Sequence, residues 1–497
     1  MQSRTFRAFA GIVIALLAGC ATQQPGPSRE DLAKIEHIVV IYAENRSFDN
    51  LYGLFPGANG IANAAPETYT QLDRDGKPLP HLPPVWKGDK PDPAFPANLP
   101  NRPFRLDVPP INLTLSVATR DLVHRFYQNQ EQIAGGRNNL FAAVSDAGGL
   151  VMGYYDGSQL PMWKWAREYV LADNFFMGAF GGSYLNHFWL ICACTPFDAA
   201  APASARSQLD EESRLKRRPD SPQSALQGPP LFVLDGDATP DGYSVNTAQP
   251  PYQPSRIRPA AGGDTRLADP ARHPLPPQTF KTIGDTLSAK GISWVWYAGA
   301  WSAALADGMQ PSGKHAVIYN TGHGASNFVP HHQPFNYFAR FAPGTPDRDR
   351  HLQDYSDFVA AIERGALPQV TFYKPQGSLN EHPGYTDVLS GDEHIAEVVA
   401  KIKASPLWAK TAIIVTYDEN GGFWDHVAPP EGDRWGPGSR IPTIIISPWA
   451  KRAYIDSTPY DTTSILKFIT RRFDLEPLPG VRPMMGDLGN AFDFSQR

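Results

Sequence analysis

Short runs of apolar residues alternate along the chain with segments whose apolar residues recur every three to four positions. The runs have the length of β-strands, and the periodic segments predict amphipathic helices. Strands are expected at HIVVIYA (37–43), YVLADNFF (169–176), SWVWYA (293–298), QVTFYK (369–374), AIIVTYD (412–418) and PTIIISP (442–448). Helices are expected at SDFVAAIERGA (356–366), DEHIAEVVAKIKASP (392–406) and DTTSILKFITRRFD (461–474). This alternation is typical of an α/β protein whose central, mainly parallel sheet is flanked by helices.

Two segments interrupt the alternation. Residues 53–112 and 198–278 are rich in Pro, Gly, Ala and charged residues, and their apolar residues show little periodicity. We interpret them as insertions that form a cap over the sheet, because long segments of this kind inside a compact domain are usually functional loops. Residues 35–497 are therefore expected to form a single domain.

Acidic and amide side chains follow two of the predicted strands directly. Glu44 and Asn45 come after the first strand, and Asp418 and Glu419 end another one. Ligands of open parallel sheets bind beyond the carboxyl ends of the strands, so these four side chains could converge on one divalent cation. In the alternative interpretation, Asn45 or the nearby Ser47 caps a helix and the acids are solvated loop residues. The spacing alone does not decide between the two.

The overall composition argues against a polyanionic partner. The 497 residues carry a formal net charge of -5 and contain no block of Lys and Arg. A protein that tracks a nucleic-acid backbone needs such a block, so nucleic-acid binding is not expected.

The N-terminus has the features of an export signal. Two arginines precede an apolar run at residues 8–18, which is too short to span a bilayer and ends in LLAGC. This ending resembles a bacterial lipoprotein signal, which predicts cleavage after residue 19 and lipid attachment at Cys20. Residues 20–34 would then be a polar tether, and the protein a periplasmic or cell-surface lipoprotein anchored in the outer membrane. The alternative is an ordinary signal peptide in which Cys20 is incidental.

The other two cysteines are Cys192 and Cys194, in the apolar stretch LICACTPF. A Cys-x-Cys pair closes a disulfide poorly because successive side chains diverge. Two buried thiols are therefore expected, with a strained bridge as the alternative.

Several motifs together resemble one known family. They are AENRSFDNLYG (43–53), DLVHRFYQNQ (121–130), GGSYLNHFWL (181–190), HHQPFNYF (331–338), NEHPGY (380–385) and YDENGGFWDHV (417–427). In sequence and order they resemble the bacterial phosphoesterase family, which contains secreted phospholipases C and a branch of acid phosphatases. The resemblance covers roughly residues 35 to 475 and implies a catalytic domain with a fold like that of alkaline phosphatase.

The resemblance also implies roles for individual residues. Ser183 would be a nucleophile placed against one divalent metal ion, and a phosphoserine would form during the reaction. Taken alone, Ser183 at the start of a predicted helix would be read as its N-cap. The implied metal ligands are Glu44, Asn45, Ser183, Asp418 and Glu419, and the implied phosphate-facing histidines are His124, His331 and His382. Residues expected behind these groups are His332, Asn186, His187 and His426. The oxygen-rich ligand set suits Mg²⁺, Ca²⁺ or Mn²⁺ and does not exclude Zn²⁺.

Within this family, the sequence favours the acid phosphatase branch. Phospholipase members have a G-P-T-x-P-N-R segment where this chain has GGSYLNH, so a phosphomonoester substrate is expected. A phospholipase C that cleaves phosphatidylcholine-like lipids is the alternative. A noncatalytic surface lipoprotein is a third hypothesis. An α/β-hydrolase esterase is disfavoured because the segment around Ser183 lacks the closing glycine of G-x-S-x-G.

Overall fold

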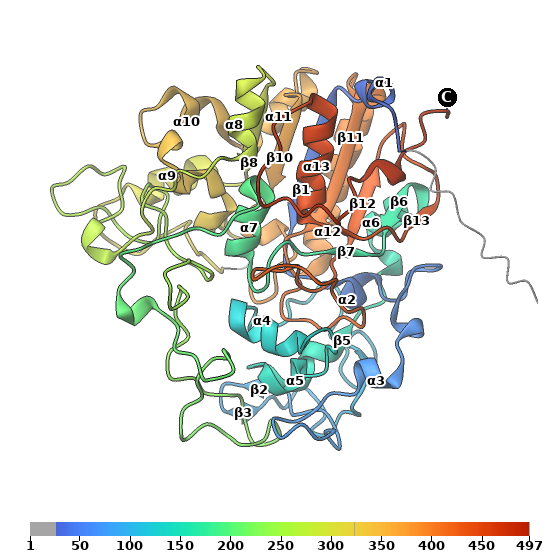
Figure 1. Ribbon diagram of the computed structural model, residues 1–497, viewed down its shortest axis with the longest axis vertical. Coiled ribbons are helices and arrows are strands. Elements are labelled where there is room, and N and C mark those ends of the chain that lie inside the picture. The colour runs from blue at the N-terminus through green and yellow to red at the C-terminus, as the bar shows by residue number, and fades with distance from the viewer. Residues whose placement is uncertain (1–25, 323, 497) are drawn as a thin grey trace, which may run out of the picture.

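An eight-stranded sheet forms the centre of the computed structural model, which describes residues 26–322 and 324–496 (Figure 1). Its strands are β1 (His37–Ala43), β6 (Val170–Ala172), β8 (Trp294–Ala298), β9 (Leu352–Asp354), β10 (Val370–Lys374), β11 (Thr411–Tyr417), β12 (Thr443–Ile446) and β13 (Tyr454–Asp456). Their order across the sheet is β13-β6-β12-β11-β1-β10-β8-β9. Only the pairings of β12 with its two neighbours are antiparallel. The predicted α/β class with a mainly parallel sheet is confirmed.

Helices cover both faces of this sheet. On one face α7 (Ser183–Cys192) packs against α13 (Thr462–Phe473), and on the other α6 (Pro161–Glu168) packs against α12 (Val388–Ala404). Further helices lie around this core or below it in Figure 1. In the described residues these are α1 (Arg29–Ala33), α2 (Phe48–Tyr52), α3 (Pro66–Tyr69), α4 (Phe126–Ile133), α5 (Phe141–Val144), α8 (Ile283–Ala289), α9 (Trp301–Gly308), α10 (Pro346–His351) and α11 (Tyr355–Glu363).

The six predicted strands and three predicted helices are all present. The stretch YVLADNFF is divided between β6 and the short β7 (Phe175–Phe176), which leaves the main sheet and pairs with β14 (Tyr460–Asp461). Strands β1 and β11 are buried along almost their whole length, because helices cover both faces of the sheet. This burial explains why they read as continuous apolar runs rather than as alternating patterns.

The register of β1 against β11 determines where the acidic side chains meet. The two strands are parallel neighbours, and Ala43 at the end of β1 lies opposite Tyr417 at the end of β11. Glu44 and Asp418 are the next residues of their chains, so both strands deliver their polar residues to the same edge of the sheet. The acids are buried and are therefore not solvated loop residues, although Ser47 does cap α2, as the second interpretation expected.

The two Pro-rich segments contain little regular structure. Residues 53–112 form α3 (Pro66–Tyr69) and the two-residue strands β2 (Trp86–Lys87), β3 (Lys90–Pro91) and β4 (Phe104–Arg105), while residues 198–278 form only two short 3-10 turns. The division into one domain with cap-forming insertions remains a prediction. Cys20 and the predicted signal lie outside the described residues. Among the described helices, none has both the length and the apolar character that a membrane span requires.

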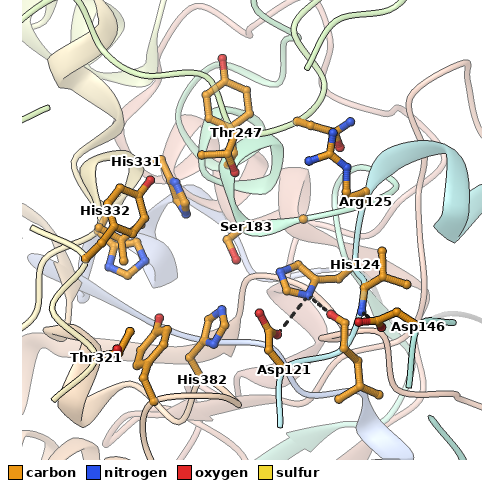
Figure 2. Close-up of a pocket in the computed structure, with 18 of the residues that line it drawn as sticks. Asp121, His124, Arg125, Asp146, Ser183, Thr247, Thr321, His331, His332 and His382 are labelled. Atoms are coloured by element: carbon orange, nitrogen blue, oxygen red, sulfur yellow. Dashed lines mark hydrogen bonds and ion pairs between the residues drawn. The ribbon is translucent and has the colours of Figure 1, made fainter. Parts of the chain in front are cut away.

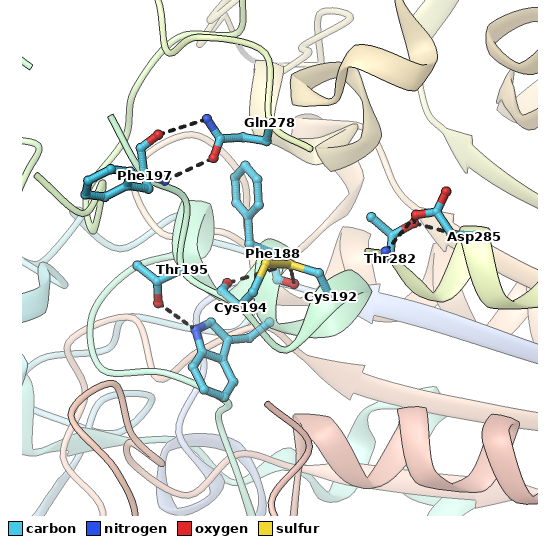
Figure 3. The surroundings of a disulfide bond; sticks show 9 residues. Phe188, Cys192, Cys194, Thr195, Phe197, Gln278, Thr282 and Asp285 are labelled. Atoms are coloured by element: carbon cyan, nitrogen blue, oxygen red, sulfur yellow. Dashed lines mark hydrogen bonds between the residues drawn. A yellow bond between two sulfur atoms is a disulfide. The ribbon is translucent and has the colours of Figure 1, made fainter. Parts of the chain in front are cut away.

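The prediction of two free thiols at Cys192 and Cys194 is wrong, because a disulfide joins them (Figure 3). Helix α7 ends at Cys192, and Ala193 takes a left-handed backbone conformation with φ 46°. This reversal lets the side chains on either side of Ala193 approach each other instead of diverging, and the two Cα atoms are 5.1 Å apart. Divergence of successive side chains holds for an extended segment, whereas here a helix end and a left-handed residue bring the two cysteines together.

Candidate active site

The site begins at the tips of β1 and β11. Glu44, Asn45, Asp418 and Glu419 are completely buried there. Asn45 adopts φ 61°, and its backbone N–H donates to Asp418 Oδ1 over 2.9 Å. A Cβ atom on Gly421 would lie 2.2 Å from the Asn45 carbonyl oxygen, so the glycine of the YDENGGF motif allows the two strand tips to pack directly against each other.

Ser183 enters this cluster from the start of α7. Its Oγ lies 3.0 Å from Asn45 Oδ1 and 3.3 Å from Glu419 Oε1. Gly182 occupies the N-cap position and Ser183 is the first helical residue, so the N-cap reading of the serine is wrong. The Ser183 hydroxyl therefore points to the site, at a helix end that favours negatively charged groups.

The oxygen atoms at the strand tips have the arrangement that a divalent cation needs. Glu44 Oε1 and Asp418 Oδ2 are buried and accept no well-formed hydrogen bond from the described residues, although Lys374 Nζ lies 3.0 Å from the first and 3.9 Å from the second. Buried carboxylate oxygens without hydrogen bonds are costly, and a bound cation would satisfy both of them. Glu419, Asn45 and Ser183 add further hard oxygen atoms beside this pair. The residues present thus fit the predicted metal ion.

The carboxylates differ in their protonation. Burial opposes ionisation of Glu44, but His332 and Lys374 outweigh this effect and hold its pKa well below the usual range. Burial raises the pKa of Asp418 to about 6 and that of Glu419 well above its usual range. Two of the three carboxylates therefore bind protons readily when no cation compensates their charge, because burial disfavours the ionised form.

Ser183 lies at the floor of a cavity of about 600 Å³, and three predicted histidines converge on it (Figure 2). His382 Nδ1 contacts the Pro383 carbonyl, and its Nε2 lies 3.0 Å from the side-chain amide nitrogen of Asn45. An N–H at Nδ1 leaves Nε2 as an acceptor, so His382 receives the Asn45 amide hydrogen and turns Oδ1 toward Ser183. His382 thereby orients the amide.

His124 differs from His382, whose Nε2 accepts a hydrogen bond, because it favours the protonated form. Its Nδ1 donates to the Leu122 carbonyl over 2.6 Å, and its Nε2 lies 3.7 Å from Glu419 Oε1. Burial lowers the pKa of His124, but Glu419 and Asp121 outweigh burial and raise it to about 9. His124 is therefore the histidine best suited to carry a proton next to Ser183.

The two adjacent histidines separate in the structure. His332 Nε2 is in contact with Glu44 Oε1, whereas His331 packs edge-on against Tyr184 and faces the cavity in Figure 2. Burial lowers the pKa of both imidazoles, to about 4 for His332. Both histidines line the cavity, and His332 also contacts Glu44, so the role of His331 as the residue that faces a substrate stays a prediction.

Of the other predicted supporting residues, two lie behind the site and one does not. The Asn186 side chain bonds to both the N–H and the carbonyl of Ala179 and so shapes the loop before Ser183. His187 lies with Nδ1 2.7 Å from the Ser183 carbonyl and 4.0 Å from Asp418 Oδ2. His426 instead belongs to a separate buried network, in which its Nδ1 lies 2.6 Å from Asp49 Oδ2. Asp49 and Asp425 both pair there with the Arg440 guanidinium.

Three residues of the site were missed in the sequence. Lys374, fully buried at the end of β10, places Nζ 3.0 Å from Glu44 Oε1. Asn380 Nδ2 and the Tyr385 hydroxyl donate to Glu44 Oε2 over 2.7 and 3.0 Å. Asn380 and Tyr385 could have been found, because they begin and end the motif NEHPGY, whereas no local pattern marks the burial of Lys374.

The fold and site define an α/β protein with a serine hydroxyl aimed at a cluster of hard oxygen ligands beneath a histidine-lined cavity. The model of the Phosphoesterase family matches residues 35–476, so the chain belongs to the phosphoesterase family. The family predicted from the sequence is confirmed. The predicted enzyme class, a phosphoric ester hydrolase, is confirmed with it.

Relatives of this chain include several bacterial proteins named as phospholipases C. A non-hemolytic phospholipase C of Burkholderia pseudomallei is 25% identical over 530 residues, which cover 98% of this chain and 62% of that protein. Phospholipase C A of Mycobacterium tuberculosis is 25% identical over 506 residues, covering 95% of this chain and 79% of the relative. The chain therefore spans less than two thirds of the Burkholderia protein.

Solved structures show a weaker likeness. A protein in the alkaline phosphatase superfamily from Vibrio parahaemolyticus gives a TM-score of 0.30 at 10% identity, covering 77% of this chain and 75% of that one. The PsFucS1 sulfatase from Pseudoalteromonas sp. gives 0.35 at 10% identity, covering 94% and 76%.

Proposed function

We propose that this chain is a metal-dependent phosphomonoesterase of the acid phosphatase type, which acts through a phosphoserine at Ser183. The observation that carries the proposal is the position of Ser183 Oγ, within 3.3 Å of both Asn45 and Glu419 at the floor of the cavity. A bound divalent ion, held by Glu44, Asn45, Asp418, Glu419 and Ser183, would lower the pKa of the serine hydroxyl and offset charge on the phosphoryl oxygens.

Side chains of the protein carry out the bond formation and the proton transfers. Ser183 Oγ forms the bond to phosphorus while the ester oxygen leaves, and its proton passes to Glu419, the carboxylate within reach. His124 protonates the departing oxygen, which otherwise leaves as a poor alkoxide. His331 faces the same cavity and can donate to a nonbridging phosphoryl oxygen. Water then attacks the phosphoserine and gives a proton to His124, while the bond between Ser183 Oγ and phosphorus breaks and Glu419 returns its proton to Ser183 Oγ.

The choice of a monoester substrate rests on the segment that carries the nucleophile. This chain has GGSYLNH there, and lacks the G-P-T-x-P-N-R segment typical of the phospholipase members. The second candidate is a phospholipase C, which the names of the relatives favour. The two activities use the same centre and differ in which side of the phosphodiester the cavity admits.

A hydrolysis panel distinguishes the two. Full-length protein in detergent is offered phosphomonoesters, phosphatidylcholine and sphingomyelin, with and without chelator. We expect phosphate release from monoesters that is lost with chelator and restored by Mg²⁺ or Mn²⁺. Phosphocholine release from the lipids without monoesterase activity would replace the proposal with the second candidate. Activity unaffected by exhaustive chelation would contradict metal dependence.

We also propose that the protein is exported and anchored through lipid at Cys20. The Cys192–Cys194 disulfide supports export, because disulfides persist mainly in oxidising compartments. Replacing Cys20 with alanine is expected to leave the precursor unprocessed or to release the protein from the membrane fraction. Fractionation and intact-mass measurement check this, and a processed, membrane-bound Cys20→Ala variant would refute the anchor.

A further inference from the structure

A buried lysine lies inside the cluster of metal ligands. Lys374 ends β10, the neighbour of β1, and its side chain is fully buried. Its Nζ lies 3.0 Å from Glu44 Oε1 and 3.9 Å from Asp418 Oδ2. Within this cluster, these two carboxylate oxygens accept no well-formed hydrogen bond from the described residues. The ammonium group thus places a positive charge beside the two carboxylate oxygens that are suited to bind a cation.

The atoms around Lys374 are of the types that bind metal ions. Glu44 Oε1 is also in contact with His332 Nε2, and Asp418 Oδ2 lies 4.0 Å from His187 Nδ1. Glu44 and these histidines belong to two overlapping groups whose donor atoms are close enough to hold an ion, one with His331 and His332 and one with His187 and Asp418. Two carboxylates and two imidazoles would suit a transition-metal ion if the lysine were absent.

The charges at the site indicate how many cations it can hold. Glu44, Asp418 and Glu419 contribute three buried carboxylates to one cluster. One divalent cation and one ammonium balance three negative charges, whereas a second divalent cation beside the ammonium would leave two excess positive charges in a buried site. Uncompensated charge is strongly disfavoured in such surroundings.

We infer that the ammonium group of Lys374 takes the place of a second divalent cation and so limits this centre to one metal ion. The inference rests on the metal site proposed above and goes beyond it, because it assigns the number of ions to one residue. Lys374 touches the ligands and not the substrate, so it acts as a positioning and charge-compensating residue.

The number of bound Mn²⁺ ions tests this. The full-length chain in detergent is stripped with chelator, equilibrated with Mn²⁺ and freed of excess metal by gel filtration. Bound Mn²⁺ is then counted by elemental analysis and examined by electron paramagnetic resonance. We expect about one ion per wild-type chain, with the spectrum of an isolated ion, and about two spin-coupled ions per chain in Lys374→Ala. Lys374→Met is the matched control, because it removes the charge but fills the space, and it should bind about one ion.

The possible outcomes distinguish a failure of this inference from a failure of the proposed metal site. Wild-type protein that binds no Mn²⁺ overturns both. If the wild-type chain and a folded Lys374→Ala variant each hold one isolated ion, only the role of Lys374 is overturned. A wild-type chain that holds two ions also overturns only that role. Lys374→Ser carries the same expectation, and it replaces the alanine variant if that variant shows no cooperative thermal transition.

Discussion

Replacing Ser183 with alanine is expected to reduce turnover by on the order of 10³-fold or more while the protein stays folded. The reason is geometric, because the structure places Ser183 Oγ, the proposed nucleophile, against the strand-tip oxygens. Rapid acid quench of the wild type during turnover should trap phosphate on the peptide that contains Ser183. Steady-state kinetics and peptide mass spectrometry measure the two effects.

A matched control makes this result specific. Ser356 is also a serine in the first turn of a helix, α11, but it is exposed and distant in sequence from every motif. Ser356→Ala should leave turnover unchanged. If Ser183→Ala keeps near-wild-type turnover and no phosphoenzyme can be trapped, water is the direct nucleophile and the role of Ser183 must be abandoned.

Replacing Asp418 with asparagine is expected to weaken metal binding by about 10²-fold or more and to reduce activity in parallel. The substitution removes the charge of a buried carboxylate whose Oδ2 has no hydrogen-bond partner among the described residues. Metal content by elemental analysis and activity over a range of Mg²⁺ or Mn²⁺ concentrations check this. Asp264→Asn makes the same chemical change where the carboxylate pairs with Arg266 near the surface, and it should have no effect.

The same carboxylates predict how metal binding depends on pH. The pKa of Asp418 is raised to about 6 and that of Glu419 lies well above its usual range, so protons compete with the cation. Metal affinity should therefore fall as the pH drops through about 6 and rise above it, with protons released on binding. Titration calorimetry in buffers of different ionisation enthalpy measures this release. An inactive Asp418→Asn variant with full metal occupancy, or a pH-independent affinity, would exclude Asp418 as a ligand.

The parts of the structure that depend on local pattern were predictable from the sequence. The central strands are long apolar runs, and α11, α12 and α13 have regular amphipathic periodicity, so both were recognised. The convergence of Glu44 with Asp418 followed from the rule that parallel strands present their carboxyl ends at one edge. The family resemblance was needed to choose between this arrangement and solvated loop acids.

What the sequence did not reveal depends on contacts between distant segments. Lys374 was overlooked because a lysine at the end of an apolar run is ordinarily solvent-exposed, and its burial depends on the position of β10 beside β1. His124 and His382 differ in their hydrogen-bond partners and in the charges nearby, and a short sequence motif does not show these neighbouring residues. His426 belongs to the motif YDENGGFWDHV, yet it pairs with Asp49 of α2 and not with the residues around Ser183.

The pairing of β1 with β11 has a consequence for when the protein becomes active. Asn45 and Asp418, which bond to each other at the site, are 373 positions apart in the chain. While the ribosome is still making the segment before β11, the first two ligands exist without their partners, and long-range contacts of this kind form late. A chain that crosses a membrane before it folds would therefore travel as an inert precursor. Its centre would assemble only at the destination, where the phosphate esters of the cytoplasm are out of its reach.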